Sequence, residues 1–153
     1  MQAALEARSA PARTAVCMAA FEPDLDLFRA QVDSIRSQAD EDWLCIVSDD
    51  CSEQDRFAEI ESILGGDHRF KLSRSGRRLG FYRNFERALT MVPVGVRYVA
   101  LADQDDRWHP GKLGTLCEAL GSAELVYSDA RVVDRDGDLI QASRGLTVAI
   151  NPG

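Results

Sequence analysis

Three carboxylates stand within four positions, at Asp103, Asp105 and Asp106, directly after the apolar run of residues 98–102. Carboxylates held this close repel one another unless a cation or a set of hydrogen-bond donors compensates. Mg²⁺ and Mn²⁺ prefer oxygen ligands and commonly use one or two protein carboxylates while a diphosphate completes the shell. The cluster therefore has two interpretations: a site for a divalent metal and phosphate, or a solvated turn in which one Asp caps the next helix.

The neighbours of the acid cluster favour a site. Residues 98–102 have the β-branched, aromatic and aliphatic content of a strand that is covered on both faces. Trp108 and Pro110 follow the cluster, and residues 112–120 then carry leucines at helical spacing. A group of acids between a buried strand and an amphipathic helix is more typical of a cleft than of a solvated surface.

A second pair of carboxylates, Asp49 and Asp50, follows another apolar run at residues 43–47. Ligands bind open α/β sheets at the carboxyl ends of their strands. We therefore expect Asp50 and Asp105 to come from different parallel strands and to open into one cleft.

Strand and helix patterns alternate along the chain. Strands are expected at residues 14–20, 43–47, 69–72 and 98–102, with helices near 24–38, 52–64, 81–92 and 112–120. This order predicts an α/β fold, a Rossmann-like and mainly parallel sheet with helices on both faces. Residues 124–133 are expected to form a further strand, and residues 139–140 to pair back after a turn at Asp136-Gly137. We expect one domain over residues 14–141, with tails at 1–13 and 142–153.

The helix ends carry local signals. Asp24 is a candidate N-cap, and Ser52 with Asp55 resembles a capping box for the second helix. Gly65-Gly66 is expected to stop that helix. In the third helix, the apolar spacing predicts that Arg83 and Asn84 face away from the core.

Between the third strand and the third helix, residues 73–78 hold the one local concentration of positive charge, in Arg74, Arg77 and Arg78. This loop is either a solvated connection or a clamp for phosphate oxygens.

The overall composition excludes several classes. A net charge of −7 and a pI near 4.8 argue against nucleic-acid binding and against a basic membrane-binding patch. Pro93, Gly95 and Arg97 interrupt the longest apolar run, so no transmembrane segment is expected. The four cysteines lack a C-x-x-C pair, which fits reduced thiols of a cytoplasmic protein, with Cys17, Cys45 and Cys117 expected to be buried.

Four motifs, in order and in spacing, resemble family 2 glycosyltransferases of the GT-A fold, in particular rhamnosyltransferase-like members. The resemblance covers about residues 14–140 and rests on Val16-Cys17-Met18-Ala19-Ala20-Phe21, Val47-Ser48-Asp49-Asp50-Cys51-Ser52, Leu79-Gly80-Phe81 with Asn84-Phe85, and Ala102-Asp103-Gln104-Asp105-Asp106-Arg107-Trp108.

The resemblance implies a role for particular residues. Ala19 and Phe21 would line a nucleobase pocket, with Asp50 hydrogen-bonding the base. Asp103 and Asp105 would form a D-x-D motif that contacts the ribose and the metal-bound diphosphate. The metal, Mg²⁺ or Mn²⁺, would be held by Asp105 and Asp106, and Arg83 completes the expected nucleotide-sugar-binding set.

The same resemblance implies an inverting transferase that moves a sugar from a dTDP- or UDP-sugar to a glycan or lipid-linked acceptor. Cell-surface polysaccharide synthesis, in the cytoplasm or at the inner face of the membrane, is the expected setting. Two features depart from the family. Phe21-Glu22 stands where members usually carry Tyr-Asn, and the chain stops at Gly153 before the expected acceptor-binding half and its catalytic base.

Two other functions compete with the transferase. A non-catalytic module that binds nucleotide sugar is compatible with the same motifs. A nucleotidyltransferase is disfavoured because such enzymes generally carry a Gly-rich basic loop after the first strand, where this chain has Ala20-Phe21-Glu22-Pro23.

Overall fold

The computed structural model describes residues 12–142. The chain divides into two compact units between Gly114 and Thr115. The expected tails at residues 1–13 and 142–153 lie almost wholly outside the described residues.

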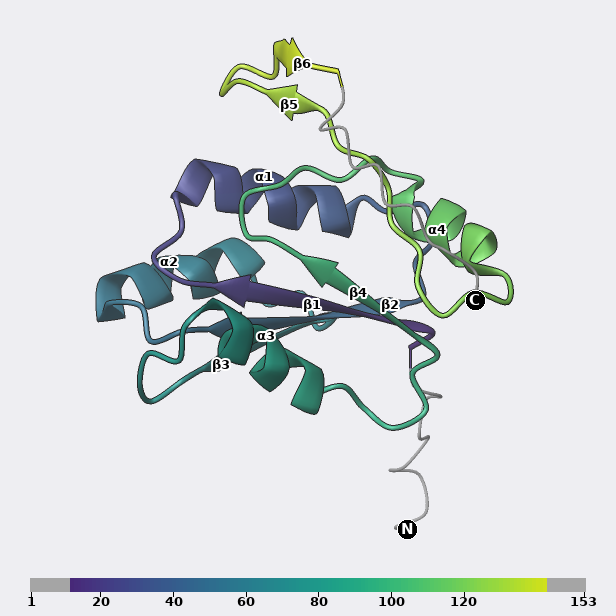
Figure 1. Cartoon of the computed structure of the whole chain (residues 1–153). Coiled ribbons are helices and arrows are strands. Elements are labelled where there is room, and N and C mark those ends of the chain that lie inside the picture. The colour runs from purple at the N-terminus through teal and green to yellow at the C-terminus, as the bar shows by residue number, and fades with distance from the viewer. Residues whose placement is uncertain (1–11, 143–153) are drawn as a thin grey trace, which may run out of the picture. The chain divides into compact units, whose positions relative to one another are not determined.

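The first unit is built on a four-stranded sheet of β1 (Thr14–Ala20), β2 (Trp43–Asp49), β3 (Phe70–Arg74) and β4 (Tyr98–Ala102). The strand order is β3-β2-β1-β4, and every neighbouring pair is parallel (Figure 1). The predicted mainly parallel α/β sheet is confirmed. All four carboxyl ends therefore meet at one edge of the sheet.

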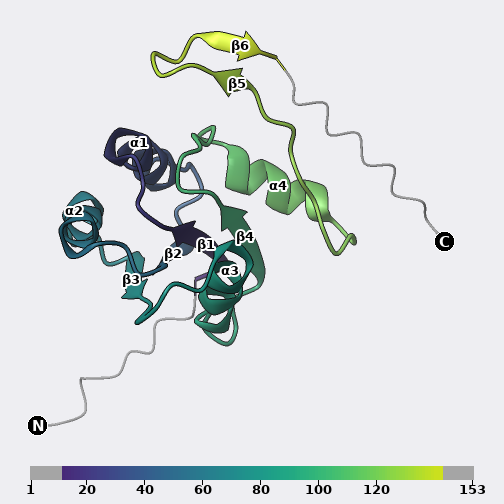
Figure 2. The same ribbon diagram turned by 60° about the vertical axis from the view of Figure 1, so that its left-hand side comes forward.

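Helices cover both faces of this sheet. The helices α1 (Leu25–Arg36) and α2 (Gln54–Leu64) lie on one face and α3 (Phe81–Thr90) lies on the other (Figure 2). The larger core joins α1 and α2 to the sheet and includes Val16, Met18, Phe28, Val32, Ile35, Val47 and Ile60. A smaller core under α3 contains Cys17, Ile46 and Ala88.

Two of the three predicted cap signals are confirmed. Asp24 caps α1 by accepting hydrogen bonds from the backbone N–H groups of residues 26 and 27, and Gly65 ends α2 in the left-handed conformation at φ 61°. The predicted capping box at Ser52 is wrong, because Glu53 is the N-cap of α2. The Ser52 hydroxyl instead donates to Asp49 at 2.5 Å. Its oxygen, which would accept from a helix N–H in a capping box, accepts from the Glu22 N–H instead.

The structure corrects two expectations about faces. Asn84 is buried, 2% exposed, and does not face away from the core, whereas Phe81 on the predicted apolar face is 61% exposed. The strand β4 is not covered on both faces, because Val99 and Leu101 are 48% and 59% exposed. It is the edge of the described sheet and α3 packs on β1 and β2, so one face of β4 is open.

The helix α4 (Lys112–Leu120) spans the boundary between the units in sequence, and the second unit continues with β5 (Val132–Val133) and β6 (Leu139–Gln141). These two strands form an antiparallel hairpin around the predicted turn. The long strand expected over residues 124–133 is wrong, since only its last two residues pair. Across residues 12–142, no helix is both long enough and apolar enough to span a membrane.

Cys17 and Cys45 are buried free thiols, as predicted. Burial raises the pKa of the Cys17 thiol to about 11 and also raises the pKa of Cys45. Cys117 is only half-buried, which corrects the expectation for that residue. High thiol pKa values make Cys17 and Cys45 poor nucleophiles, so they serve packing.

Asp67 lies just before β3, and we predict that its ionisation makes the free energy of unfolding depend on pH at acid pH. The hydrogen bond from the Arg69 side chain lowers the pKa of Asp67 from 3.8 to about 2. Because the folded pKa lies below the unfolded one, the stabilisation is present at neutral pH and is lost as the pH falls from about 5 towards 2. Asp67→Asn should lower the free energy of unfolding at pH 7 by about 1 kcal/mol, allowing for solvent screening.

The measurement is urea unfolding of wild type and Asp67→Asn across that pH range. The two midpoints should converge as the pH falls. A difference that stays constant from neutral to acid pH would contradict an ionic origin.

Candidate functional site

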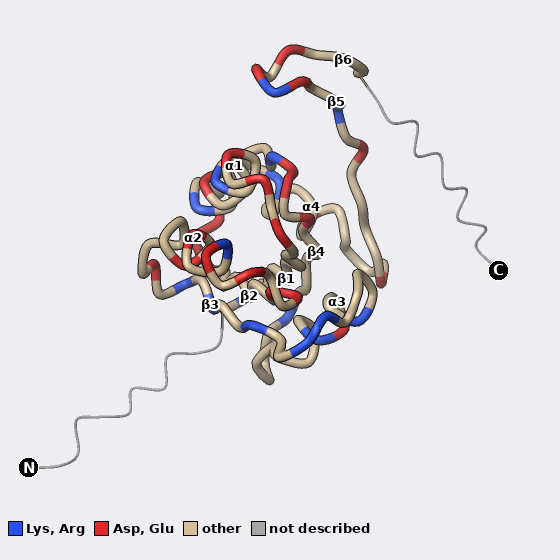
Figure 3. Tube along the Cα trace, turned by 90° about the vertical axis from the view of Figure 1, so that its left-hand side faces the viewer, with Lys and Arg blue, Asp and Glu red and all other residues tan. Residues whose placement is uncertain are grey.

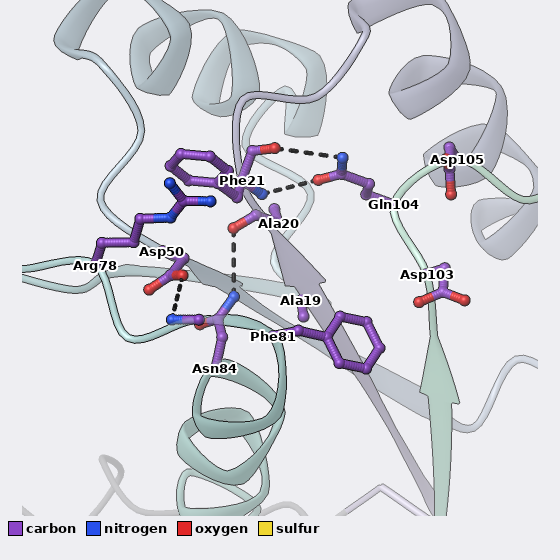
Figure 4. A pocket seen from close by; sticks show the side chains of 11 residues that line it. Ala19, Ala20, Phe21, Asp50, Arg78, Phe81, Asn84, Asp103, Gln104 and Asp105 are labelled. Atoms are coloured by element: carbon purple, nitrogen blue, oxygen red, sulfur yellow. Dashed lines mark hydrogen bonds between the residues drawn. The ribbon is translucent and has the colours of Figure 1, made fainter.

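A pocket of about 320 Å³ lies at the carboxyl ends of β1, β2 and β4 (Figure 4). It is lined by Ala19, Ala20, Phe21, Asp50, Arg78, Gly80, Phe81, Asn84, Asp103, Gln104 and Asp105. The structure thus brings Asp50 and the Asp103/Asp105 pair to one cleft, as the parallel topology predicts.

Asp50 ties the connection between β3 and α3 to the end of β2. This residue is 3% exposed, and its carboxylate accepts hydrogen bonds from the backbone N–H of Leu79 at 2.6 Å and of Gly80 at 2.8 Å. These donors lie at the N-terminus of α3, where the helix dipole favours negative charge. Asp50 therefore fixes the loop that forms one wall of the pocket.

The neighbouring Asp49 turns away from the pocket. It is fully buried, accepts hydrogen bonds from the Ser52 N–H and hydroxyl, and lies 3.7 Å from Arg74 Nε. Of the two acids after β2, only Asp50 reaches the cleft. Arg74 is consequently occupied by Asp49 and the start of α2.

The acidic loop after β4 forms the opposite wall. The Asp103 carbonyl accepts a hydrogen bond from Gln31 Nε2 at 3.1 Å, and Gln31 is fully buried in α1. The carboxylates of Asp103 and Asp105 are exposed and line the pocket, while Asp106 is exposed but is not part of the lining. A buried anchor thus holds the backbone of an acidic loop whose side chains reach solvent.

The aromatic side of the pocket holds its cation. The Arg78 guanidinium stacks over the Phe21 ring at 4.0 Å from its centroid. Arg83, the predicted site arginine, is exposed on α3 and does not line the pocket. Figure 3 shows the positive charge along the connection from β3 to α3, where the sequence concentrates it. The sequence signal that could have identified Arg78 as a pocket residue is its position in that basic loop.

Glu22, one of the two residues that depart from the family pattern, contacts the start of α2. At φ 42°, it accepts a hydrogen bond from the Glu53 N–H at 2.5 Å and lies 3.6 Å from Arg56, while its own N–H donates to the Ser52 hydroxyl at 2.9 Å. Glu22 thus caps α2 from the neighbouring loop. The positive φ is a strained conformation for a residue with a side chain, held by these contacts.

The family model for glycosyl transferase family 2 matches residues 16–149. The chain belongs to that family. None of the curated proteins matches it.

Solved glycosyltransferase structures share the fold. The chain resembles S. aureus TarS 1-349 in complex with UDP-GlcNAc, at 15% identity and a TM-score of 0.62, over 79% of this chain and 40% of that one. It also resembles the mannosyltransferase PcManGT from Pyrobaculum calidifontis in complex with GDP-Man and Mn²⁺, at 17% identity and a TM-score of 0.61, over 81% and 36%. This family 2 chain spans about two-fifths or less of these two structures.

The side chains at the pocket suit a divalent cation. Within residues 12–142, no group of three or more His, Cys, Asp or Glu side chains could by itself hold a metal ion. A Mg²⁺ or Mn²⁺ that is shared with a diphosphate needs only one or two protein carboxylates. Asp105 offers such an oxygen at the pocket edge, and Asp106 follows it.

Proposed function

We propose that this family 2 chain carries the nucleotide-sugar site of a glycosyltransferase. The observation that supports it is the convergence, in one pocket at the strand ends, of a Phe21–Arg78 stack and the Asp103/Asp105 pair. An aromatic ring with a stacked guanidinium can bind a nucleobase. An acidic loop can bind a divalent cation, which in turn binds a diphosphate.

The proposed donor lies across the pocket. Ala19, Phe21 and Arg78 bind the base, and the loop fixed by Asp50 closes the base against the β1 end. Asp103 contacts the ribose. The diphosphate lies at Asp105 with a divalent ion that Asp105 and Asp106 hold, and Arg83 on α3 serves the outer part of the nucleotide sugar.

The negative charge of the pocket lining supports the proposal of a bound divalent metal ion. Among the residues that line the pocket there are three carboxylates and, within this described part of the chain, one cation, Arg78. A diphosphate that enters without a metal would meet net repulsion at Asp103 and Asp105. A bound Mg²⁺ or Mn²⁺ supplies electrostatic stabilisation of the leaving nucleoside diphosphate.

We further propose an inverting hexosyl transfer from a dTDP- or UDP-sugar to a glycan or lipid-linked acceptor in cell-surface polysaccharide synthesis, in the cytoplasm or at the inner membrane face. The rhamnosyltransferase-like motif favours dTDP. The ligands named with the two structural neighbours, UDP-GlcNAc and GDP-Man, support the nucleotide-sugar class.

The test is isothermal calorimetry of the chain with dTDP, UDP and GDP, each with Mn²⁺ and with chelator. We expect one nucleotide to bind at least tenfold more tightly with Mn²⁺. Binding of none of them would overturn the proposed function. Donor hydrolysis and sugar transfer assays then separate an enzyme from a module that only binds nucleotide sugar.

A further inference from the structure

Gln104, the residue inside the acidic motif, is hydrogen-bonded to Phe21, the residue that follows β1. Its Oε1 accepts a hydrogen bond from the Phe21 N–H at 2.8 Å, and its Nε2 donates to the Phe21 carbonyl at 3.3 Å (Figure 4). One side-chain amide thus satisfies both backbone groups of a residue 83 positions away.

These two hydrogen bonds extend the connection between β1 and β4 beyond the last pair of residues in their register. The β1–β4 register ends at Met18 and Ala102, so Phe21 and Gln104 lie beyond the last paired residues of the two strands. A primary amide offers the donor and acceptor that a neighbouring strand would have supplied. Asparagine has the same amide on a side chain shorter by one methylene, and leucine has the bulk without the polar atoms.

We infer that Gln104 is a positioning residue that holds the two halves of the pocket at a fixed separation. Phe21 with its Arg78 stack is one half, and the Asp103/Asp105 pair is the other. The inference rests on the proposed function, because only a ligand that spans both halves makes their separation matter.

The second anchor of the acidic loop shows why Gln104 sets the spacing. The hydrogen bond from Gln31 fixes the Asp103 carbonyl to α1, and α1 follows Phe21 through a short loop. Gln31 therefore holds the loop against the helix layer, whereas Gln104 holds it against the aromatic wall. Ligand affinity depends on such preorganisation when two subsites must be engaged together.

The affinity for a ligand that contacts only one half of the pocket should not change when the Gln104–Phe21 hydrogen bonds, which we call the clamp, are lost. A free nucleobase needs only the half formed by Phe21 and Arg78, whereas a nucleoside diphosphate with Mn²⁺ needs both halves. Gln104→Leu and Gln104→Asn should weaken Mn²⁺–nucleoside diphosphate binding about tenfold and leave nucleobase binding within about twofold. A loss of fold would weaken both ligands equally.

The experiment measures the affinity of the whole chain for the free nucleobase and for the nucleoside diphosphate with Mn²⁺, using the nucleotide that binds wild type most tightly. Gln54→Leu is the matched control, since Gln54 is an exposed glutamine that bonds Arg74 away from the pocket. Hydrogen exchange of the Phe21 amide, followed by NMR without ligand, reports directly on its hydrogen bond to Gln104. The exchange should be faster in both Gln104 variants and unchanged in Gln54→Leu.

The outcomes separate the inference from the function beneath it. A selective loss of diphosphate binding together with faster Phe21 exchange supports the positioning role. Equal loss of both ligands, unchanged diphosphate affinity, or unchanged Phe21 exchange overturns that role while the proposed function stands. A wild type that binds no nucleotide overturns the proposed function, and with it the need for a fixed separation.

Discussion

Asp105→Asn should abolish most of the Mn²⁺ dependence of nucleoside diphosphate binding. Asp105 lines the pocket and is exposed, and it is the carboxylate at which the proposed metal-bound diphosphate lies. Asparagine keeps the shape but removes the charge that attracts the ion. We expect the affinity with Mn²⁺ to fall at least tenfold, towards the value measured with chelator.

The control for this variant is Asp55→Asn, an exposed acid in the first turn of α2 that makes the same change in net charge. It should leave the Mn²⁺ dependence within about twofold. Asp106→Asn tests the second proposed ligand, and its effect should be smaller because Asp106 does not line the pocket. Equal affinity with Mn²⁺ and chelator in wild type would favour the solvated-turn interpretation of the acid cluster.

The sequence predicts that Asp50 and the Asp103/Asp105 pair meet at one pocket, and the reason is topological. Parallel strands end at the same edge, so acids that follow β2 and β4 must lie near one another whatever their side chains do. Asp24 and Gly65 are predictable for a similarly local reason, since capping depends on a few adjacent residues.

Contacts between distant segments are what the sequence hides. Gln104 bonds Phe21 across 83 positions, and no pattern in the acidic motif marks its amide as a clamp. Periodicity in α3 sorts residues by hydrophobicity and therefore assigns the polar Asn84 and Arg83 to the same outer side. The structure buries the first and exposes the second. Likewise, the apolar content of β4 predicts coverage, but coverage depends on where α3 packs.

Asn84 is predicted to be among the largest single polar contributions to stability. Its Nδ2 donates to the Ser48 carbonyl at 2.8 Å and to the Ala20 carbonyl at 3.3 Å, and its Oδ1 accepts from the Ser48 hydroxyl at 2.6 Å. Arg87 donates to that hydroxyl in turn, at 2.6 Å. The amide of this pocket-lining residue therefore joins α3 to the ends of β1 and β2.

Asn84→Asp is the informative substitution, because it preserves volume but removes both donors and turns a negative charge on two carbonyl oxygens. Removing one partner from a buried hydrogen-bond network leaves the others unsatisfied. We expect a loss of about 3 kcal/mol in the free energy of unfolding, measured by urea denaturation at pH 7. Asn84→Ala should cost a similar amount through lost bonds and lost packing.

Glu86→Ala, on the exposed side of the same helix, is the control and should change the free energy of unfolding by less than about 0.5 kcal/mol. If Asn84→Asp and Glu86→Ala unfolded at the same urea concentration, Asn84 would not be bonded within the core, and α3 would be held to the sheet by Ala88 and its apolar neighbours alone. A selective loss at Asn84 would instead show that the helix behind the pocket is fixed by polar contacts at its first turn, which is where the Gly80 N–H meets Asp50.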